Sequence, residues 1–254
     1  VGSNISIYDT IMVNVVGNTT ITSTSQLDVP CYMGNTGSAS FTYQTTSVNP
    51  LTIWWNPPVS TTTSASNLTA GTYTVYLADT FAQALPCTLS HVFTILEPPV
   101  LSAVTTSVTN VNCHLESNGS INITTSGGTP PYTYTWNTNP VQTTEDAANL
   151  PVGTYSVNIT DAHNCTTAVN NIAITEPPVL AISALNATIA TCGNSNGTAN
   201  VTATGGTLPY NYTWNNNPNP NSSNLANAAG GNYTIHISDG HGCTVDSAIT
   251  ILAP

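Results

Sequence analysis

The residues with the most definite chemistry are six cysteines, spread over a chain of 254 residues. They form two sets, whose members recur at spacings of 82 and 79 and of 78 and 78 residues: Cys31, Cys113 and Cys192, and Cys87, Cys165 and Cys243. No C-x-x-C spacing typical of a metal site is present. The even count in an acidic, Asn- and Thr-rich chain predicts structural disulfides formed in an oxidising compartment. The simplest of the fifteen connectivities pairs the cysteines of each copy: Cys31–Cys87, Cys113–Cys165 and Cys192–Cys243.

The remaining polar side chains predict neither catalysis nor a cofactor. The five histidines lie in no G-x-S-x-G or H-E-x-x-H motif and beside no phosphate-binding glycine loop, so we predict that the protein is not an enzyme. Asp161 and Asp239 each begin a short Asp-x-His segment, where the carboxylate either caps a turn or contributes to a Ca²⁺ site. Glu97 and Glu176 lie at the links between copies, where their carboxylates are also candidates for binding Ca²⁺ between adjacent domains. One carboxylate per copy favours the turn, and no metal site is predicted.

The charge balance excludes several classes of partner. The chain has no Lys or Arg and a formal net charge of −11. Charged residues make up 4% of it, against about 25% in an ordinary domain. Without a fixed cation we expect no binding to nucleic acid or anionic lipid. Apolar runs of only a few residues predict no membrane insertion. The chain opens without a signal-peptide pattern, so we expect a mature, extracellular or cell-surface protein.

Aromatic residues repeat with the same period as the cysteines. Trp55, Trp136 and Trp214 are 81 and 78 residues apart, and a matching tyrosine series, Tyr73, Tyr155 and Tyr233, is spaced by 82 and 78. The chain is therefore three copies of one unit. In the second copy, short alternating segments at residues 100–113, 117–128, 129–137, 152–161 and 170–178 are separated by Gly, Pro and Asn. We predict an all-β fold of three tandem immunoglobulin-like β-sandwich domains in a rod, at residues 1–97, 98–176 and 177–254.

The motifs within the copies resemble a known repeat. GGTPPYTYTW at residues 127–136 returns as GGTLPYNYTW at residues 205–214, and each is followed by a Gly-x-Tyr strand and a D-x-x-x-C segment. This pattern is similar to the SprB repeat, named after a gliding-motility surface adhesin of bacteroidete bacteria. The first copy departs from it, with no Gly-Gly pair and a longer Asp79–Cys87 spacing. The resemblance implies a long, secreted cell-surface protein made of strung sandwiches, with no catalytic residues.

Three further features predict how each copy is built. The repeated tryptophans are expected to fill cores, whereas Trp54, on the opposite face from Trp55, is the candidate outward aromatic. The tyrosines of the periodic series resemble a tyrosine corner, in which the hydroxyl ties the crossover loop. EPPV at residues 97–100 and 176–179 predicts a stiff, extended link between sandwiches.

The first copy has about thirty residues before its leading cysteine, where the others have about thirteen. Residues 5–17 are therefore extra, and they read as a β-strand whose apolar residues stand at odd positions: Ile5, Ile7, Ile11, Val13 and Val15. The strand either becomes an eighth strand of the first sandwich or completes a sheet in a neighbouring subunit. In the second case the protein's partner is itself, as a homopolymer formed by strand addition.

We also expect covalent glycans, which would cover a surface with almost no charge. The candidates are the N-x-S/T asparagines and two sites resembling the bacteroidete D-(S/T)-apolar O-glycosylation signal: Asn4, Asn18, Asn67, Asn118, Asn122, Asn158, Asn164, Asn186, Asn196, Asn200, Asn211, Asn221 and Asn232, with Thr10 and Ser247. Together these features predict a non-catalytic structural subunit of an extracellular fibre. The alternative is a stalk or binding segment of a large adhesin that recognises glycans or surfaces.

Overall fold

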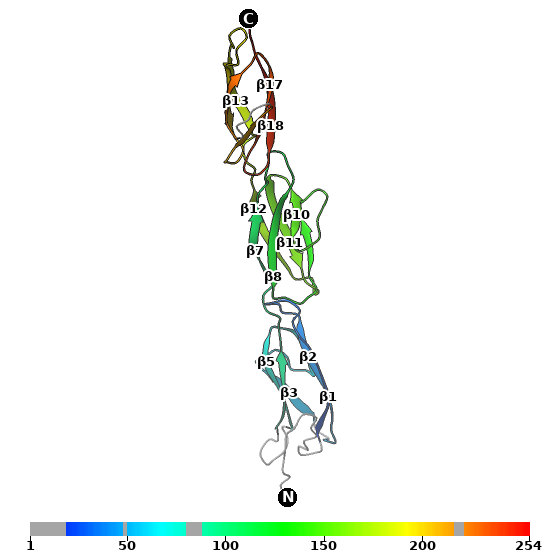
Figure 1. The fold of residues 1–254 in the computed structure, drawn as a ribbon. Coiled ribbons are helices and arrows are strands. Elements are labelled where there is room, and N and C mark those ends of the chain that lie inside the picture. Colours follow the sequence, from blue (N-terminus) through cyan, green and yellow to red (C-terminus); the bar gives the residue numbers. More distant parts are fainter. Residues whose placement is uncertain (1–18, 48–49, 80–87, 216–220) are drawn as a thin grey trace. The chain divides into compact units, whose positions relative to one another are not determined.

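The computed structural model describes residues 19–47, 50–79, 88–215 and 221–254, and every regular element in these ranges is a β-strand (Figure 1). Each repeat supplies six strands. The first repeat has β1 (Thr20–Leu27), β2 (Gly37–Gln44), β3 (Leu51–Asn56), β4 (Ser64–Leu68), β5 (Gly71–Asp79) and β6 (Thr88–Ile95). The second has β7 (Ser102–Thr109), β8 (Gly119–Ser126), β9 (Thr133–Trp136), β10 (Ala147–Leu150), β11 (Gly153–Thr160) and β12 (Thr166–Ile174). The third has β13 (Ala181–Thr188), β14 (Gly197–Thr204), β15 (Asn211–Trp214), β16 (Asn224–Ala228), β17 (Gly231–Ser238) and β18 (Thr244–Ile251).

The strands form six three-stranded sheets, two from each repeat. One sheet joins the first, second and fourth strands of a repeat, in the orders β1-β2-β4, β7-β8-β10 and β13-β14-β16. The other joins the third, fifth and sixth, in the orders β3-β5-β6, β9-β11-β12 and β15-β17-β18. The chain therefore crosses between sheets within each repeat, as in an immunoglobulin-like sandwich. The predicted all-β, immunoglobulin-like class is confirmed.

Each described core is built by alternate residues of facing sheets. In the first repeat Phe41 of β2 lies 6.2 Å, between ring centroids, from Trp55 of β3, which stacks on Phe93 of β6 at 5.4 Å. The core of the third repeat combines Val201 of β14 with Trp214 of β15 and residues of β17 and β18. Side chains alternate in and out because successive strand residues point to opposite faces. The buried face of each strand thus supplies the hydrophobic contacts between the two sheets.

The periodic tryptophans are buried, as predicted, with at most 4% of each side chain exposed. The indole N–H of each donates to a loop carbonyl seven or eight residues later, at 2.9 Å for Thr62, 3.0 Å for Thr144 and 3.1 Å for Ser222. A buried tryptophan needs such a partner for its one donor. Each tryptophan therefore fills a core and also fixes the loop that follows its strand.

The predicted tyrosine corner occurs in all three repeats. The hydroxyl donates to the backbone carbonyl four residues earlier: Tyr73 to Thr69 at 3.1 Å, Tyr155 to Pro151 at 2.8 Å and Tyr233 to Ala229 at 3.0 Å. Burial raises the pKa of the Tyr155 hydroxyl. The bond ties each crossover loop to the strand that follows it.

Two sequence expectations differ from the described fold or fall outside it. The short fourth strand of each repeat was not predicted, because four or five residues between turns carry almost no periodic signal. The proposed joining strand, Ile5, Ile7, Ile11, Val13 and Val15, lies outside the described residues, so both of its interpretations stay predictions. The predicted domain limits also stay predictions.

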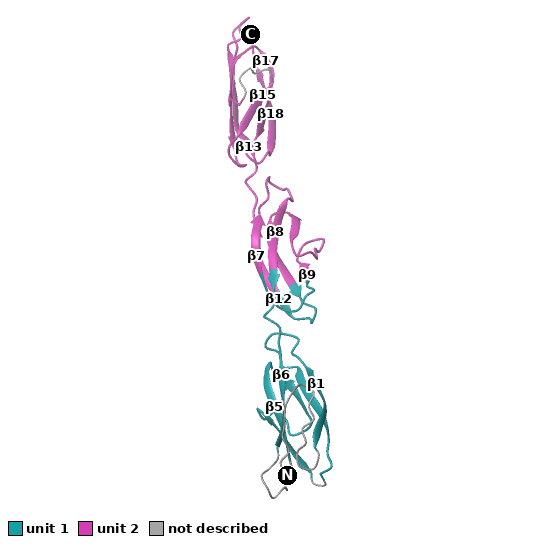
Figure 2. Ribbon diagram, turned by 60° about the horizontal axis from the view of Figure 1, so that its bottom comes forward, with its two compact units in different colours: residues 1–103, 125–133, 159–167 teal, residues 104–124, 134–158, 168–254 magenta. Residues whose placement is uncertain are grey.

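The chain divides into two compact units (Figure 2). One unit contains residues 1–103 together with 125–133 and 159–167, and the other contains residues 104–124, 134–158 and 168–254. The first unit thus combines the first repeat with the start of the second and two further segments of it, residues 125–133 and 159–167. The second unit combines the rest of the second repeat with the third.

Candidate functional site: the joints between repeats

The leading cysteine of the first and second repeats lies in a loop that is held by the last strand of its own repeat. Backbone N–H groups just before the cysteine donate to carbonyls at the strand's end: Val29 to Leu96 at 2.9 Å and Val111 to Thr175 at 3.0 Å. Because the first and last strands end together, the loop is fixed beside the outgoing EPPV link. The leading cysteine therefore lies at the end of its repeat from which the link to the next repeat leaves.

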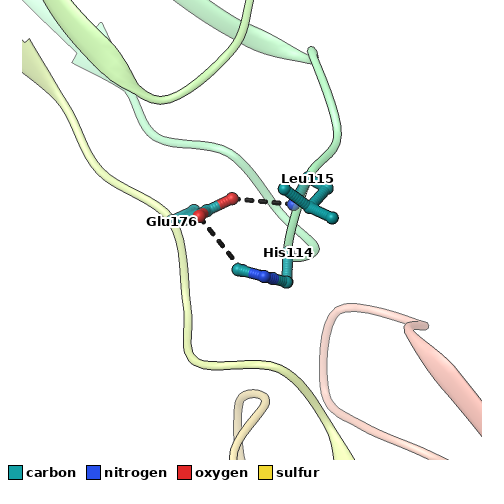
Figure 3. A network of polar contacts seen from close by, with 3 residues as sticks. All are labelled: His114, Leu115 and Glu176. Atoms are coloured by element: carbon teal, nitrogen blue, oxygen red, sulfur yellow. Dashed lines mark hydrogen bonds and ion pairs between the residues drawn. The ribbon is translucent and has the colours of Figure 1, made fainter.

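The glutamate of each link clamps this loop. Glu176 accepts the backbone N–H of Leu115 at 2.7 Å through Oε2, and its Oε1 lies 3.0 Å from Nδ1 of His114 (Figure 3). Glu97 accepts the N–H of Met33 at 2.6 Å in the same way. Met33 and Leu115 adopt positive φ values of 56° and 63°, which are uncommon for residues other than glycine. The carboxylate thus stabilises a backbone turn that the residue type alone disfavours.

The following repeat meets the link through its Gly-Gly turn. Gly128 donates its N–H to Pro99, and Gly206 donates to Pro178, both at 2.8 Å. The preceding glycines, Gly127 and Gly205, have φ values of 72° and 74°. A Cβ at either one would overlap the carbonyl oxygen of the link, which belongs to Val100 in one case and Val179 in the other. Only glycine fits there, which explains why the Gly-Gly pair recurs.

The tyrosine of the P-Y-x-Y motif holds this turn in place. Tyr132 donates its hydroxyl to the carbonyl of Gly127, and Tyr210 donates to Gly205, both at 2.6 Å. The motif GGTxPY therefore encodes one structure, a glycine turn seated on the incoming link and tied by the tyrosine five residues later. The sequence alone showed the motif but not that its contact is with the preceding link.

An aspartate organises the loop that carries the trailing cysteine. Oδ1 of Asp161 accepts the N–H groups of His163 and Cys165, at 2.8 and 2.9 Å, and Oδ2 accepts that of Thr129 at 2.9 Å. Asp239 repeats the arrangement with His241, Cys243 and Thr207, at 2.9, 2.9 and 2.8 Å. Both carboxylates are buried, with 5% and 3% of each residue exposed. They join the trailing-cysteine loop to the Gly-Gly turn of the same repeat.

The pKa of both aspartates is lowered. Burial by itself would raise the pKa of Asp161, but the backbone N–H donors of Thr129, Cys165 and His163 and the nearby His163 ring outweigh it. The pKa of Asp239 is lowered against burial by the equivalent donors Thr207, Cys243 and His241. The hydrogen bonds support the turn-capping interpretation of these residues. Among the described residues no group of three or more His, Cys, Asp or Glu is placed to hold a metal ion.

Disulfides close the joints, and the predicted pairing is wrong. Cys31 bonds to Cys165 with a Cα–Cα distance of 5.7 Å, and Cys113 bonds to Cys243 at 5.6 Å. Each bond links the leading cysteine of one repeat to the trailing cysteine of the next. Cys31–Cys87, Cys113–Cys165 and Cys192–Cys243 are therefore excluded, since each contains a cysteine bonded elsewhere. Cys192 is exposed and unbonded, and Cys87 lies outside the described residues.

The length of the last strand explains the error. In the second repeat β12 begins directly after Cys165 and ends two residues before Glu176, which holds the loop bearing Cys113. Nine strand residues span roughly 30 Å, whereas a disulfide needs Cα atoms within about 7 Å. The two cysteines of one repeat stand at opposite ends of the sandwich and cannot meet.

The completed joints have matching contacts around the disulfide. Sγ of Cys165 lies 3.4 Å from the carbonyl oxygen of Pro30, and Sγ of Cys243 lies 3.5 Å from that of Asn112. In the second joint Nδ1 of His241 also lies 3.2 Å from the Asn112 carbonyl. Each joint falls within one compact unit. A link, a leading-cysteine loop and a Gly-Gly turn with its trailing cysteine are thus assembled twice from the same parts.

The candidate glycosylation sites are mostly accessible. All described sequon asparagines are exposed, whereas Ser247 is half-buried and Asn4, Asn18 and Thr10 lie outside the described residues. The exposed set is Asn67, Asn118, Asn122, Asn158, Asn164, Asn186, Asn196, Asn200, Asn211, Asn221 and Asn232. The amide nitrogens of Asn118 and Asn196 donate to Glu116 and Thr191. Attachment of sugar at any of these positions stays a prediction.

Comparison with known proteins confirms the resemblance to the SprB repeat. Its family profile matches residues 105–141 and 185–219, which lie in the second and third repeats. No curated protein matches the chain. No helix able to cross a membrane occurs in the part of the chain that the structure describes.

Several solved structures of tandem domains are similar to the chain at low identity. The three N-terminal domains of the highly immunogenic outer capsid protein Hoc of bacteriophage RB49 give a TM-score of 0.45 at 15% identity, covering 92% of this chain and 97% of that one. The N-terminal eight Ig domains of Down syndrome cell adhesion molecule give 0.39 at 11%, covering 89% and 36%. Domains 1–6 of surface layer protein SbsC give 0.31 at 12%, covering 92% and 40%.

The fold and the repeat match define the class of protein. The described residues form immunoglobulin-like repeats. Two segments of the chain match the SprB repeat, a family of cell-surface proteins whose domains are typically non-catalytic. The two disulfides fit an extracellular location.

Proposed function

We propose that the chain is a non-catalytic structural subunit of an extracellular, glycosylated surface fibre. The observation that carries this proposal is the construction of the joints. In both joints the repeated motif residues connect one sandwich to the next. The connection consists of the link, the glutamate that holds the leading-cysteine loop, the Gly-Gly turn and a disulfide. A protein whose recurring polar residues serve connection is suited to transmit load along its length.

Self-association is the second part of the proposal. The apolar residues between Ile5 and Val15 would supply a donor strand to a neighbouring copy, as in β-strand addition. Electron microscopy of the purified chain at neutral pH tests this directly. Uniform filaments are expected for the full chain, and folded monomers for a chain lacking residues 1–17. Filaments of the shortened chain would contradict the donor-strand role.

A second variant keeps the full length of the chain and replaces Val13 and Val15 with Thr, which keeps β-branched side chains but removes apolar surface. Reduced polymerisation at unchanged circular dichroism is expected. Glycosylation is tested on the same material, because an intact mass equal to the bare 26.3 kDa polypeptide would exclude covalent sugar.

One observation favours the alternative, a stalk or binding segment of a large adhesin that recognises glycans or surfaces. Trp54 is 37% exposed and stacks on Tyr76 with ring centroids 5.2 Å apart and planes inclined by 10°. Exposed aromatic faces suit the apolar face of a sugar ring. Binding of the chain to an array of glycans, lost in Trp54→Ala and retained in Trp54→Phe, would support this function. Filament formation without any glycan binding would leave the structural subunit as the better account.

A further inference from the structure

One pair of aromatic side chains lies on the outside of a sheet in the first repeat. Trp54 of β3 faces away from the core, because the next residue along the strand, Trp55, is buried in it. Trp54 is the register partner of Tyr76 in β5, and the two rings stack with centroids 5.2 Å apart and planes inclined by 10°. The indole is 37% exposed, so the pair presents an aromatic surface to solvent that the core does not use.

The other two repeats carry different residues at these two positions. The residue before the periodic tryptophan is Thr135 in the second repeat and Thr213 in the third. The residue three places after the periodic tyrosine is Asn158 in the second and His236 in the third. Thr213 and His236 are register partners in β15 and β17, as the aromatic pair is in β3 and β5. The sandwich therefore forms without the aromatic pair, which needs an explanation other than folding.

Groups that form hydrogen bonds surround the pair on the same face of the sheet, in which β3, β5 and β6 lie side by side (Figure 1). Thr52 and Asn56 are exposed and stand two residues on either side of Trp54, a step of roughly 7 Å along the strand. Ser90 of β6 is exposed and is the register partner of Tyr76. The aromatic surface is thus bordered by hydroxyl and amide side chains, and none of these neighbours is charged.

The chemistry of this surface matches a neutral sugar. A hexopyranose ring with equatorial substituents has a face made only of C–H groups, which packs against the negatively polarised face of an indole. The hydroxyl groups at the rim of such a ring both donate to and accept from hydroxyl and amide side chains. An acidic sugar needs a cation for its carboxylate or sulfate, and the chain has no Lys or Arg and a net charge of −11. The charge of the protein therefore selects against acidic glycans.

We propose that Trp54 and Tyr76 form the binding surface for a neutral polysaccharide of equatorially linked hexopyranose units, one ring of which stacks on the indole. Equatorial linkages leave the faces of each ring clear for this contact. Tyr76 holds the indole in one orientation, which lowers the entropy lost on binding, and Thr52, Asn56 and Ser90 supply hydrogen bonds to the hydroxyl groups of the sugar. The inference rests on the alternative function given above and goes beyond it by naming the charge and linkage of the ligand.

Isothermal titration calorimetry of the full chain tests the site with three oligosaccharides. Cellohexaose, which is neutral and equatorially linked, should bind. The same oligosaccharide oxidised to carboxylates at its primary hydroxyl groups should bind more weakly, because the protein is acidic. Maltohexaose, whose linkages are axial, should also bind more weakly, because its rings do not lie flat on the indole. The measurement is the same for single chains and for filaments, so it does not depend on the state of assembly.

The variants use residues that the other repeats already carry. Trp54→Thr/Tyr76→Asn gives the first repeat the pair found in the second, and we expect cellohexaose to bind about tenfold more weakly or worse at unchanged thermal unfolding. Tyr32→His is the matched control. It replaces another aromatic residue, 49% exposed, by the residue that follows the leading cysteine of the second repeat, and it should bind as the wild type does.

The outcomes separate this inference from the functions proposed above. Cellohexaose binding that is equal in the double variant, or no tighter than that of the oxidised sugar or of maltohexaose, overturns the inference. Binding to acidic glycans on an array, with none to cellohexaose, overturns it and leaves the adhesin alternative standing. A chain that binds no glycan overturns both. The fibre is tested separately by electron microscopy, since the double variant should form filaments as the wild type does.

Discussion

Cys113 and Cys243 are 130 residues apart in the sequence, and a disulfide holds their Cα atoms 5.6 Å apart. The bond closes a loop that contains most of two repeats, so it constrains the unfolded chain strongly. In the chain-entropy model a loop of this length contributes about 5 kcal/mol before strain. Its position decides which cysteine substitutions matter.

We expect the double variant Cys113→Ser/Cys243→Ser to lose several kcal/mol of unfolding free energy, measured by guanidinium titration. Cys192→Ser is the matched control and should unfold like the wild type when both are kept monomeric, because Cys192 bonds to no residue of its own chain. An equal loss in the control would restore the pairing of Cys192 with Cys243.

Gly205→Ala should destabilise the third repeat. The substitution places a Cβ against the Val179 carbonyl and strains a residue with φ of 74°. Gly193→Ala is a close control, because its φ of 73° is nearly the same but nothing lies within 4 Å. The control should cost about 1 kcal/mol from backbone strain alone, and Gly205→Ala at least twice as much. Equal shifts in thermal unfolding would mean that the link does not approach the turn closely.

Acid should weaken both joints. The pKa of Asp161 and Asp239 is lower in the folded chain than the ordinary value of 3.8, so the unfolded chain binds protons first as the pH falls. Their contribution to stability is complete well above pH 3.8 and is lost as the pH falls through that value and below. Asp161→Asn/Asp239→Asn should be less stable at neutral pH and should show a shallower decline between pH 5 and pH 2. An unchanged pH slope would rule out this role.

Removing a tyrosine hydroxyl should lower the unfolding free energy more at a buried tyrosine corner than at an exposed one. Tyr155→Phe breaks the bond to the Pro151 carbonyl at a residue that is 8% exposed, and we expect a loss of about 1 kcal/mol. Tyr233→Phe removes the same bond at a more exposed residue, where water replaces it, so a smaller loss is expected. The two variants are compared by chemical denaturation, and a larger effect at Tyr233 would contradict the argument.

Much of the fold could be predicted because its signals are local and repeated. The two-residue alternation and the periodic Trp and Tyr series define strands, cores and corners without knowledge of distant contacts. The roles of Gly127 and Asp161 were harder, since a motif does not show which part of the chain it touches. Each acts on a partner about 30 residues away, Val100 in one case and Thr129 in the other.

The disulfide pairing failed because nearness within a repeat does not imply nearness in space. Four strands, β8 to β11, lie between Cys113 and Cys165, and the chain crosses between the two sheets among them, so a count of strands does not show at which end of the sandwich it arrives. The predicted pairing treated the two cysteines of a repeat as neighbours, whereas the length of β12 separates Cys165 from the loop that bears Cys113. The cysteines that meet come from adjacent repeats, where the end of one sandwich faces the start of the next.

The two disulfide loops overlap, because residues 113–165 belong to both. If tension is applied to the two ends of the chain, the shortest covalent path runs through residues 1–31, back along 165–113 and out through 243–254. If all three sandwiches unfold under force while the disulfides persist, only those segments are pulled straight, and the rest of the chain adds no length between the two ends. A tether of this design has a fixed limit of extension under flow, and a single backbone cut in either EPPV link would not sever it.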